Sequence, residues 1–170
     1  MRALLIVVAA LMTACAPTGA HPSPFPRPGG YPSEVSPSPA GTTGTTLPST
    51  GYAVSGTALA LRGVPYKNGG ADPKGFDCSG FVWYVFGQHG LSVPRSVEDQ
   101  FGAGGSVTPA DLAAGDLVFF STTSPGASHV GIVVGGDSFV HAPSSSGVVR
   151  VERLGSSYWA SRFVGARRIL

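Results

Sequence analysis

The segment Gly75–Tyr84 reads GFDCSGFVWY, and it predicts the N-terminus of a buried helix. Asp77 is suited to cap this helix, expected over residues 78–89, because its side-chain oxygens can accept hydrogen bonds from unpaired backbone N–H groups. Cys78 then lies in the first turn, where those N–H groups and the helix dipole favour an anion such as a thiolate. This position alone fits a small buried hydrophobic residue and a reactive nucleophile equally well.

The residues around this helix predict an α+β domain. Residues 52–62 have a helical pattern, and short helices are expected after Ser96 and Thr108, each of which has an acid three positions later. After Gly115 the pattern changes to short apolar strands bounded by turn residues. The expected strands cover residues 116–120, 129–134, 138–141, 148–153 and 163–169. The fold class is therefore N-terminal helices packed on a mainly antiparallel sheet of about five strands.

The chain begins with MRALLIVVAALMTAC, which has the pattern of an export signal. Its apolar run, residues 3–11, follows Arg2 and is too short to span a bilayer. Cys15 comes almost directly after this run, which resembles a bacterial lipoprotein signal, so residues 1–14 are expected to be removed and Cys15 to carry lipid such as palmitate. Plain secretion stays open as the alternative. An acylated Cys15 would leave Cys78 as an unpaired thiol in an oxidising compartment.

Composition divides the rest of the chain into a tether and one domain. Nine of the fifteen prolines fall in residues 16–50, where Arg27 and Glu34 are the only acidic or basic side chains apart from one histidine, so this stretch cannot bury a core. Residues 15–50 are expected to be a disordered tether, and residues 51–170 a single domain. The net charge of +2 gives no reason to expect nucleic-acid binding, and five arginines after residue 138 fit a solvated sheet edge better.

Three histidines lie in the predicted domain. His89 comes at the expected end of the Cys78 helix, where a cap or surface role suffices. His129 opens the strand HVGIVV and His141 closes the strand SFVH, so both lie at the same end of a predicted hairpin. One cysteine at a helix N-terminus with two histidines at one strand end fits an activated nucleophile, its base and an orienting group.

The turn between the two histidine strands predicts their relative orientation. If Gly135-Gly136-Asp137 forms a three-residue loop, His141 pairs with Gly131, and His129 lies diagonally on the same face. A two-residue loop would place the histidines on opposite faces. We therefore expect the two imidazoles to share a face and to approach the N-terminus of the Cys78 helix.

Three motifs give these residues a specific resemblance. GVPYKNGG at 63–70 with GFDCSGFVWY, LAAGDLVFF at 112–120 and SHVGIVVGGDSFVHA at 128–142 resemble, in this order, motifs of the NlpC family of bacterial cell-wall cysteine peptidases. The resemblance covers about residues 55–170. It implies a papain-like α+β domain that hydrolyses amide bonds in the stem peptides or cross-links of peptidoglycan through an acyl-enzyme.

The resemblance also implies residue roles. Cys78 would be the nucleophile, His129 the general base and then acid, and His141 the residue that orients His129. Tyr66 would help the Cys78 backbone N–H to stabilise the oxyanion. Asp77 would line the substrate cleft, although capping explains it as well.

Other matched positions extend this cleft and limit the prediction. Ser79 would also line it, whereas Arg95 and Gln100 match a family motif but are explained equally well by capping and packing. Asn68 stands where many members carry an aromatic residue, so the shape of a subsite, and the bond that is cut, stay open.

The resemblance further implies no metal, no cofactor and no nucleic-acid partner. The expected partners are peptidoglycan peptides and, through the Cys15 lipid, a membrane, with the domain a monomer. Ala16 after the lipidated cysteine resembles a signal for the periplasmic face of the outer membrane. Two alternatives stay open: a wall-binding module without turnover, and a zinc hydrolase that uses Cys78, His129 and His141 as ligands.

Overall fold

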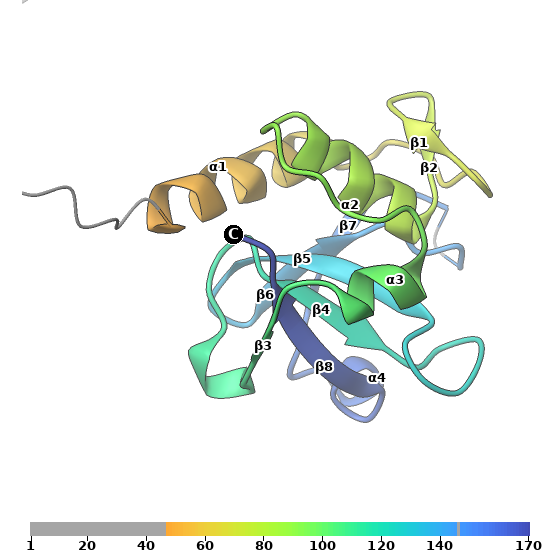
Figure 1. Ribbon diagram of the computed structural model, residues 1–170. Helices are drawn as coiled ribbons and strands as arrows, with labels where there is room; N and C mark the ends of the chain where they lie inside the picture. The colour runs from red at the N-terminus through yellow and green to blue at the C-terminus, as the bar shows by residue number, and fades with distance from the viewer. Residues whose placement is uncertain (1–46, 146) are drawn as a thin grey trace, which may run out of the picture. The chain divides into compact units, whose positions relative to one another are not determined.

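The computed structural model describes residues 47–145 and 147–170. The expected signal peptide, Cys15 and nearly all of the expected tether lie outside these residues. Within them, four α-helices and one 3-10 turn accompany eight strands (Figure 1). The helical elements are α1 (Leu47–Ala60), α2 (Cys78–Gly87), α3 (Val97–Gly102), η1 (Pro109–Asp111) and α4 (Ser157–Ala160). No helix in this part of the chain is long and apolar enough to cross a membrane.

The main sheet is antiparallel and has six strands in the order β3-β8-β4-β5-β6-β7. Its strands are β3 (Gly105–Val107), β4 (Leu117–Phe120), β5 (His129–Gly135), β6 (Ser138–His141), β7 (Arg150–Arg153) and β8 (Phe163–Arg168). The C-terminal strand β8 lies inside the sheet between β3 and β4. The α+β prediction is confirmed, with six strands rather than about five, because the short Gly-rich β3 lacks the apolar pattern that marks a strand.

Three further elements, two strands and one helix, were not predicted. β1 (Ala71–Asp72) and β2 (Gly75–Phe76) form a separate two-stranded sheet that leads directly into α2. The helix α4 lies between β7 and β8 and is a single turn. Elements this short carry too few residues for a hydrophobic period to show in the sequence.

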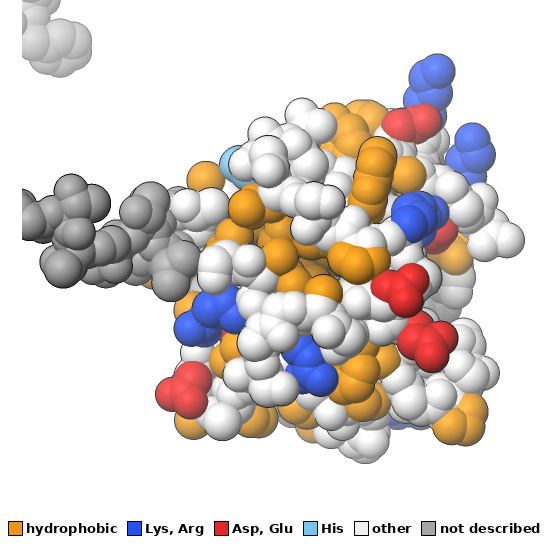
Figure 2. Space-filling view, viewed as in Figure 1, with side chains coloured by type: hydrophobic (Ala, Val, Ile, Leu, Met, Phe, Trp, Pro, Cys, Tyr) orange, Lys and Arg blue, Asp and Glu red, His pale blue; other side chains and the backbone are white. Residues whose placement is uncertain are grey.

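Apolar side chains form a core on each face of the main sheet. Because successive side chains on a strand alternate, Val130 and Ile132 face α1 and α2, whereas Val133 faces the opposite way. The helix-side core is the larger of the two, and Figure 2 shows hydrophobic side chains in the middle of the viewed face, between α1 and α2 on one side and β3 on the other. The opposite core is closed by Trp159 from α4, which is 6% exposed.

The β5–β6 hairpin has the predicted register, but a different turn produces it. Gly135 pairs with Ser138, so two residues rather than three form the loop, and the pairing then shifts by one at a bulge between Val133 and Gly135. After the bulge Val133 pairs with Phe139, as the predicted register requires. Gly135 has φ of 126°, which only glycine adopts readily, and this explains how the extra residue is accommodated.

Candidate active site

Cys78 is the first residue of α2, and its helix begins as the sequence predicts. Asp77 is the N-cap and accepts a hydrogen bond of 2.7 Å from the backbone N–H of Gly80. Gly80 is required for close packing, since a Cβ there would collide with the carbonyl oxygen of Gly70. The helix ends at Gly87, two residues before the predicted end, and His89 instead bonds Thr57 of α1 at 2.9 Å.

The two histidines meet as predicted. The Nε2 atom of His129 and the Nδ1 atom of His141 lie 2.7 Å apart, and both side chains are buried. Gly131 makes this approach possible, because a Cβ at that position would lie 2.5 Å from the Phe139 ring and 3.2 Å from Cβ of His141. The hairpin register therefore brings together two imidazoles from residues twelve positions apart.

The shared face differs from the expected direction. By strand alternation both histidines lie on the face that carries Trp159, not on the face covered by α1 and α2. His129 is the first residue of β5, so it stands at the end of the sheet. Cys78 lies near the same strand end, because α2 packs on β5 and the backbone of Val130, the neighbour of His129, is among the groups that favour the ionised form of its sulfur.

An aromatic enclosure surrounds the histidine pair. Trp159 stacks on His129 with ring centroids 5.6 Å apart, and it meets His141 edge-on at 4.9 Å. The ring of Phe139 lies 4.9 Å from that of His141. Burial in this enclosure lowers the pKa of His129 to about 4, and burial together with His129 and Arg150 lowers the pKa of His141. Both imidazoles are consequently neutral at pH 7.

The thiol of Cys78 is also neutral in the resting site. Burial raises its pKa first, and the negative charge of Asp77 raises it further, against hydrogen bonds from backbone groups that favour the thiolate. The backbone groups at the helix N-terminus still favour the thiolate, as the sequence indicates, but burial and Asp77 outweigh them. The same carboxylate that caps the helix opposes ionisation of the neighbouring sulfur.

A polar cluster flanks Cys78 on the side of α2. The guanidinium of Arg95 donates to both carboxylate oxygens of Asp77, at 2.6 and 3.0 Å, and to the hydroxyl of Ser79 at 2.8 Å. Gln100 is fully buried and donates to the backbone carbonyl of Ser79 at 3.1 Å. Arg95 thus belongs to the candidate site. Its position in the sequence motif fitted capping or packing equally well and did not predict this placement.

Tyr66 also lies close to the sulfur. Its pKa is raised by partial burial and by the charges of Cys78 and Asp77, so its hydroxyl keeps its proton and can donate a hydrogen bond. A β-bridge to Phe76 and a backbone hydrogen bond to Gly147 fix its position. The candidate substrate-binding residues Tyr66, Asp77 and Ser79 therefore gather around Cys78.

Trp159 is the site residue that the sequence interpretation missed. It comes from the unpredicted α4, where serines precede the aromatic pair Tyr158-Trp159, a weak sign of a helix N-terminus. Its indole N–H donates to Glu152 at 3.2 Å. Nothing in the local sequence indicates that this ring covers two histidines.

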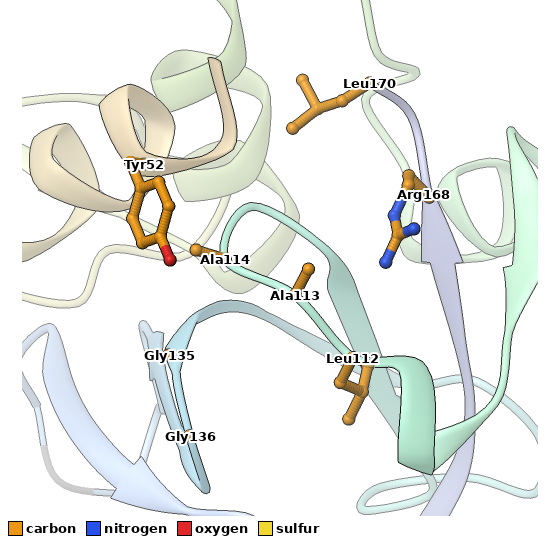
Figure 3. Close-up of a pocket in the computed structure, with 8 residues that line it drawn as sticks. All are labelled: Tyr52, Leu112, Ala113, Ala114, Gly135, Gly136, Arg168 and Leu170. Carbon is orange, nitrogen blue, oxygen red and sulfur yellow. The ribbon is translucent and has the colours of Figure 1, made fainter. Parts of the chain in front are cut away.

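The described residues contain no group of three or more His, Cys, Asp or Glu side chains arranged to hold a metal ion. The nitrogen atoms that His129 and His141 turn toward each other are occupied by their mutual hydrogen bond. Another cavity, of about 320 Å³, lies between α1 and the β5–β6 turn, where Tyr52 and Gly135 line it (Figure 3). It is at the opposite end of β5 from His129 and is separate from the candidate site.

Comparison with known proteins identifies the family. Residues 63–168 match the model of the NlpC/P60 family. The chain is 47% identical over 110 residues to the murein DD-endopeptidase MepS/murein LD-carboxypeptidase of Escherichia coli, a match that covers 64% of this chain and 57% of that protein. It is also 47% identical over 116 residues to the gamma-DL-glutamyl hydrolase of Bacillus subtilis, covering 66% of this chain and 28% of that one. The chain thus spans little more than half, or less, of these relatives.

Solved structures agree with this match. A lipoprotein-like NLP/P60 protein of Staphylococcus aureus superposes with a TM-score of 0.66 at 34% identity, over 77% of this chain and 45% of that chain. RipD of Mycobacterium tuberculosis, described as a non-catalytic NlpC/p60 domain protein adapted to peptidoglycan binding, superposes with a TM-score of 0.60 at 25% identity, over 71% and 97%. Because the family model covers more than half of the chain, this protein belongs to the NlpC/P60 family.

Proposed function

We propose that this protein is a cysteine endopeptidase that hydrolyses amide bonds in the peptide part of peptidoglycan. The observation that carries the proposal is the paired, buried His129 and His141 at the strand end that contacts Cys78. Family membership and relatives named as murein and glutamyl peptide hydrolases support the substrate class. Their names specify different bonds, so the bond cut here is a separate question.

The first half of the reaction begins with the neutral pair. The Cys78 sulfur attacks the scissile carbonyl carbon while its proton passes to His129. His129 then gives this proton to the leaving nitrogen, the carbon–nitrogen bond breaks, and a thioester to Cys78 remains. The Nε2 atom of His129 is already hydrogen-bonded to Nδ1 of His141. His141 therefore holds His129 in the tautomer whose Nδ1 atom is free to accept the proton.

The second half releases the product. Water loses a proton to His129 and attacks the thioester carbon, and the proton returns to the sulfur as the carbon–sulfur bond breaks. During both attacks the oxyanion would be bound by the backbone N–H of Cys78 and by the protonated hydroxyl of Tyr66. Each such donor contributes roughly 100- to 1,000-fold to the rate.

The N-terminal segment gives the proposed location. Acylation at Cys15 would hold the domain on a membrane, and the Pro-rich segment before α1, residues 16–46, would let it reach the wall from the periplasmic face of the outer membrane. Membrane fractionation with mass measurement of the mature N-terminus tests this. A wholly soluble protein with an unmodified N-terminus would contradict it.

Digestion of purified peptidoglycan, with products analysed by mass, tests the enzymatic proposal. The wild-type protein should release new amine-terminated fragments, and C78A should release none while keeping its melting temperature within a few degrees. Substantial digestion by C78A would remove Cys78 from the proposed role. Inhibition by a chelator but not by a thiol reagent would instead favour the zinc alternative.

The alternative of binding without turnover is a real one in this family, because RipD is described as non-catalytic. The same digestion separates it from the proposed function. Sedimentation of the wild-type protein with intact peptidoglycan, without any released fragment, would favour the binding module.

A further inference from the structure

A second cavity adjoins the proposed base. It has a volume of about 160 Å³; His129 lines it, whereas Asp77, Ser79 and Arg95 of the polar cluster are not among its lining residues. Its walls come from the β4–β5 loop, the β6–β7 loop and α4. The lining residues are Thr122, Thr123, His129, Pro143, Ser144, Ser145, Tyr158 and Trp159. We call this space the hydroxyl pocket, because five of its eight lining side chains carry a hydroxyl group.

The position of the pocket fixes which part of a substrate it would meet. In the proposed reaction His129 donates a proton to the leaving nitrogen, so that nitrogen must come within hydrogen-bonding reach of the imidazole. The residue that leaves with the nitrogen then continues on the His129 side of the sulfur. The hydroxyl pocket, which His129 itself lines, is the cavity on that side.

The pocket offers unused hydrogen-bond donors. In residues 47–145 and 147–170, the side-chain hydroxyls of Thr122, Ser144 and Tyr158 have no hydrogen-bond partner in the protein, and the same holds for Thr123 and Ser145. Among the residues that the structure describes, no acidic side chain lines the space. A cluster of free hydroxyl donors without a competing carboxylate is suited to a substrate group that only accepts hydrogen bonds.

The charges around the pocket favour an anion. The guanidinium of Arg162 lies over the ring of Tyr158, 3.9 Å from its centroid, and among described residues it bonds only neutral oxygens. Glu152 accepts the hydrogen bond of the Trp159 indole N–H, and its charge is balanced by Arg150 at 2.9 Å. The excess positive charge next to the pocket is therefore that of Arg162.

We propose that the hydroxyl pocket binds a free carboxylate on the carbon that bears the leaving nitrogen. This inference rests on the proposed function and extends it to the choice of bond. In a D,D cross-link whose nitrogen comes from a diaminodicarboxylic acid, and in an L,D bond to a terminal D-amino acid, the leaving residue carries such a carboxylate. In a γ-D-glutamyl bond within a tetrapeptide stem, the same carboxyl group is already part of the next amide. The pocket thus favours the first two bonds.

The test uses two substrates that differ in one group. One is a cross-linked muropeptide dimer with the free carboxylate beside the scissile nitrogen, and the other is the same dimer with that carboxylate converted to a primary amide. For the wild-type protein we expect kcat/KM to be at least about tenfold lower on the amide, because hydrogen bonds to a charged group are the strong ones. A tetrapeptide stem with an intact γ-D-glutamyl bond should be cut more slowly than the free-carboxylate dimer.

Variants locate the discrimination. Y158F and S144A each remove one hydroxyl from an exposed side chain, and each should lower the free-to-amide ratio by several-fold, mainly through KM for the free carboxylate. Y52F is the matched control, because Tyr52 is 67% exposed on α1 and lines the separate cavity at the other end of β5. Its ratio should equal that of the wild type.

The outcomes are distinguishable. No turnover of any of the three substrates by the wild-type protein would defeat the proposed function itself. Cleavage of both dimers with equal kcat/KM, or faster cleavage of the γ-D-glutamyl stem, would overturn the pocket assignment and leave the proposed function standing. An equal loss on both dimers in Y158F and S144A would also overturn it, because those hydroxyls would then shape the cleft without recognising charge.

Discussion

The two sides of the candidate site are built in opposite ways. On the α2 side, Cys78 lies next to a carboxylate, a guanidinium and a hydroxyl that bond one another, and Arg95 has 41% of its side chain exposed. On the sheet side, His129 and His141 are enclosed by aromatic rings, and the second imidazole nitrogen of His141 has no hydrogen-bond partner in the described part of the chain. One side is polar and partly open, and the other is apolar and closed.

Both sides of the site nevertheless favour the uncharged forms of Cys78 and His129. Asp77 and burial raise the pKa of the thiol, and the aromatic enclosure lowers the pKa of the base. A neutral thiol and a neutral imidazole suit the proposed reaction, in which the proton of Cys78 passes to His129 during the attack on the carbonyl.

The largest expected effect separates the two histidines. H129A should lower kcat/KM by about 1,000-fold or more, because it removes the proposed acid and base. H141N should lower it by only about 10- to 100-fold, because a polar group can still accept the His129 hydrogen bond. Steady-state kinetics on one muropeptide, with melting curves to show folding, compares them. Greater damage in H141N would reverse the assigned roles.

Removing the aromatic cover tests why His129 is neutral. W159A should destabilise the fold by about 3 to 5 kcal/mol and should move the acid limb of the kcat/KM profile upward, toward the ordinary histidine pKa near 6.5. W159F keeps an apolar ring and should leave the acid limb near pH 4, although it loses the bond to Glu152. An unchanged acid limb in W159A, measured at a temperature where the variant is folded, would contradict the proposed effect of burial.

The sequence predicted the α2 side and the histidine pair because their signals are local. A helix cap, a glycine opposite a histidine and a hairpin register depend on residues close together in the chain or on simple alternation. The face that the histidines occupy depends instead on which side α1 and α2 cover, which no local pattern states. Alternation gave the relative direction of His129 and His141 but not the absolute one.

The aromatic enclosure of the histidines and the raised pKa of Cys78 could not be predicted for the same reason. Trp159 reaches the histidines from a one-turn helix between two strands, so only the folded topology brings it there. The pKa of Cys78 depends on a balance between the helix N-terminus, burial and Asp77. The sequence indicates the helix N-terminus, but it does not indicate how deeply the thiol is buried. In the β5–β6 hairpin the prediction was wrong only about the turn. The predicted register is present, but a bulge produces it rather than a longer loop.

Changing the charge on the α2 side should affect the thiol more than the fold. D77N removes the negative charge that raises the Cys78 pKa and leaves the Arg95 cation nearby, so the thiol pKa should fall. Asparagine caps helices about as well as aspartate, which keeps the cost in stability below about 1 kcal/mol. The pH dependence of alkylation by iodoacetamide measures the shift. S79A, which keeps the charge, should leave the alkylation profile close to that of the wild type, and the same profile in D77N would show that Asp77 does not control the thiol.

The smallest effect concerns stability on the sheet side. His129 has a pKa of about 4 when folded and about 6.5 when unfolded, so between these values the unfolded chain binds a proton that the folded chain does not. The resulting stabilisation of the folded state is complete above pH 6.5 and is lost as the pH falls toward 4. The free energy of unfolding falls by about 1 kcal/mol per pH unit for each buried imidazole. Carboxylates contribute little between pH 6.5 and 5, because they remain ionised in both states. Urea unfolding at pH 7, 6 and 5 should therefore give a falling free energy of unfolding.

The variant H141N carries one buried imidazole fewer, so its free energy of unfolding should fall with pH about half as steeply. Equal slopes for the two proteins would mean that His141 is not held neutral by its enclosure.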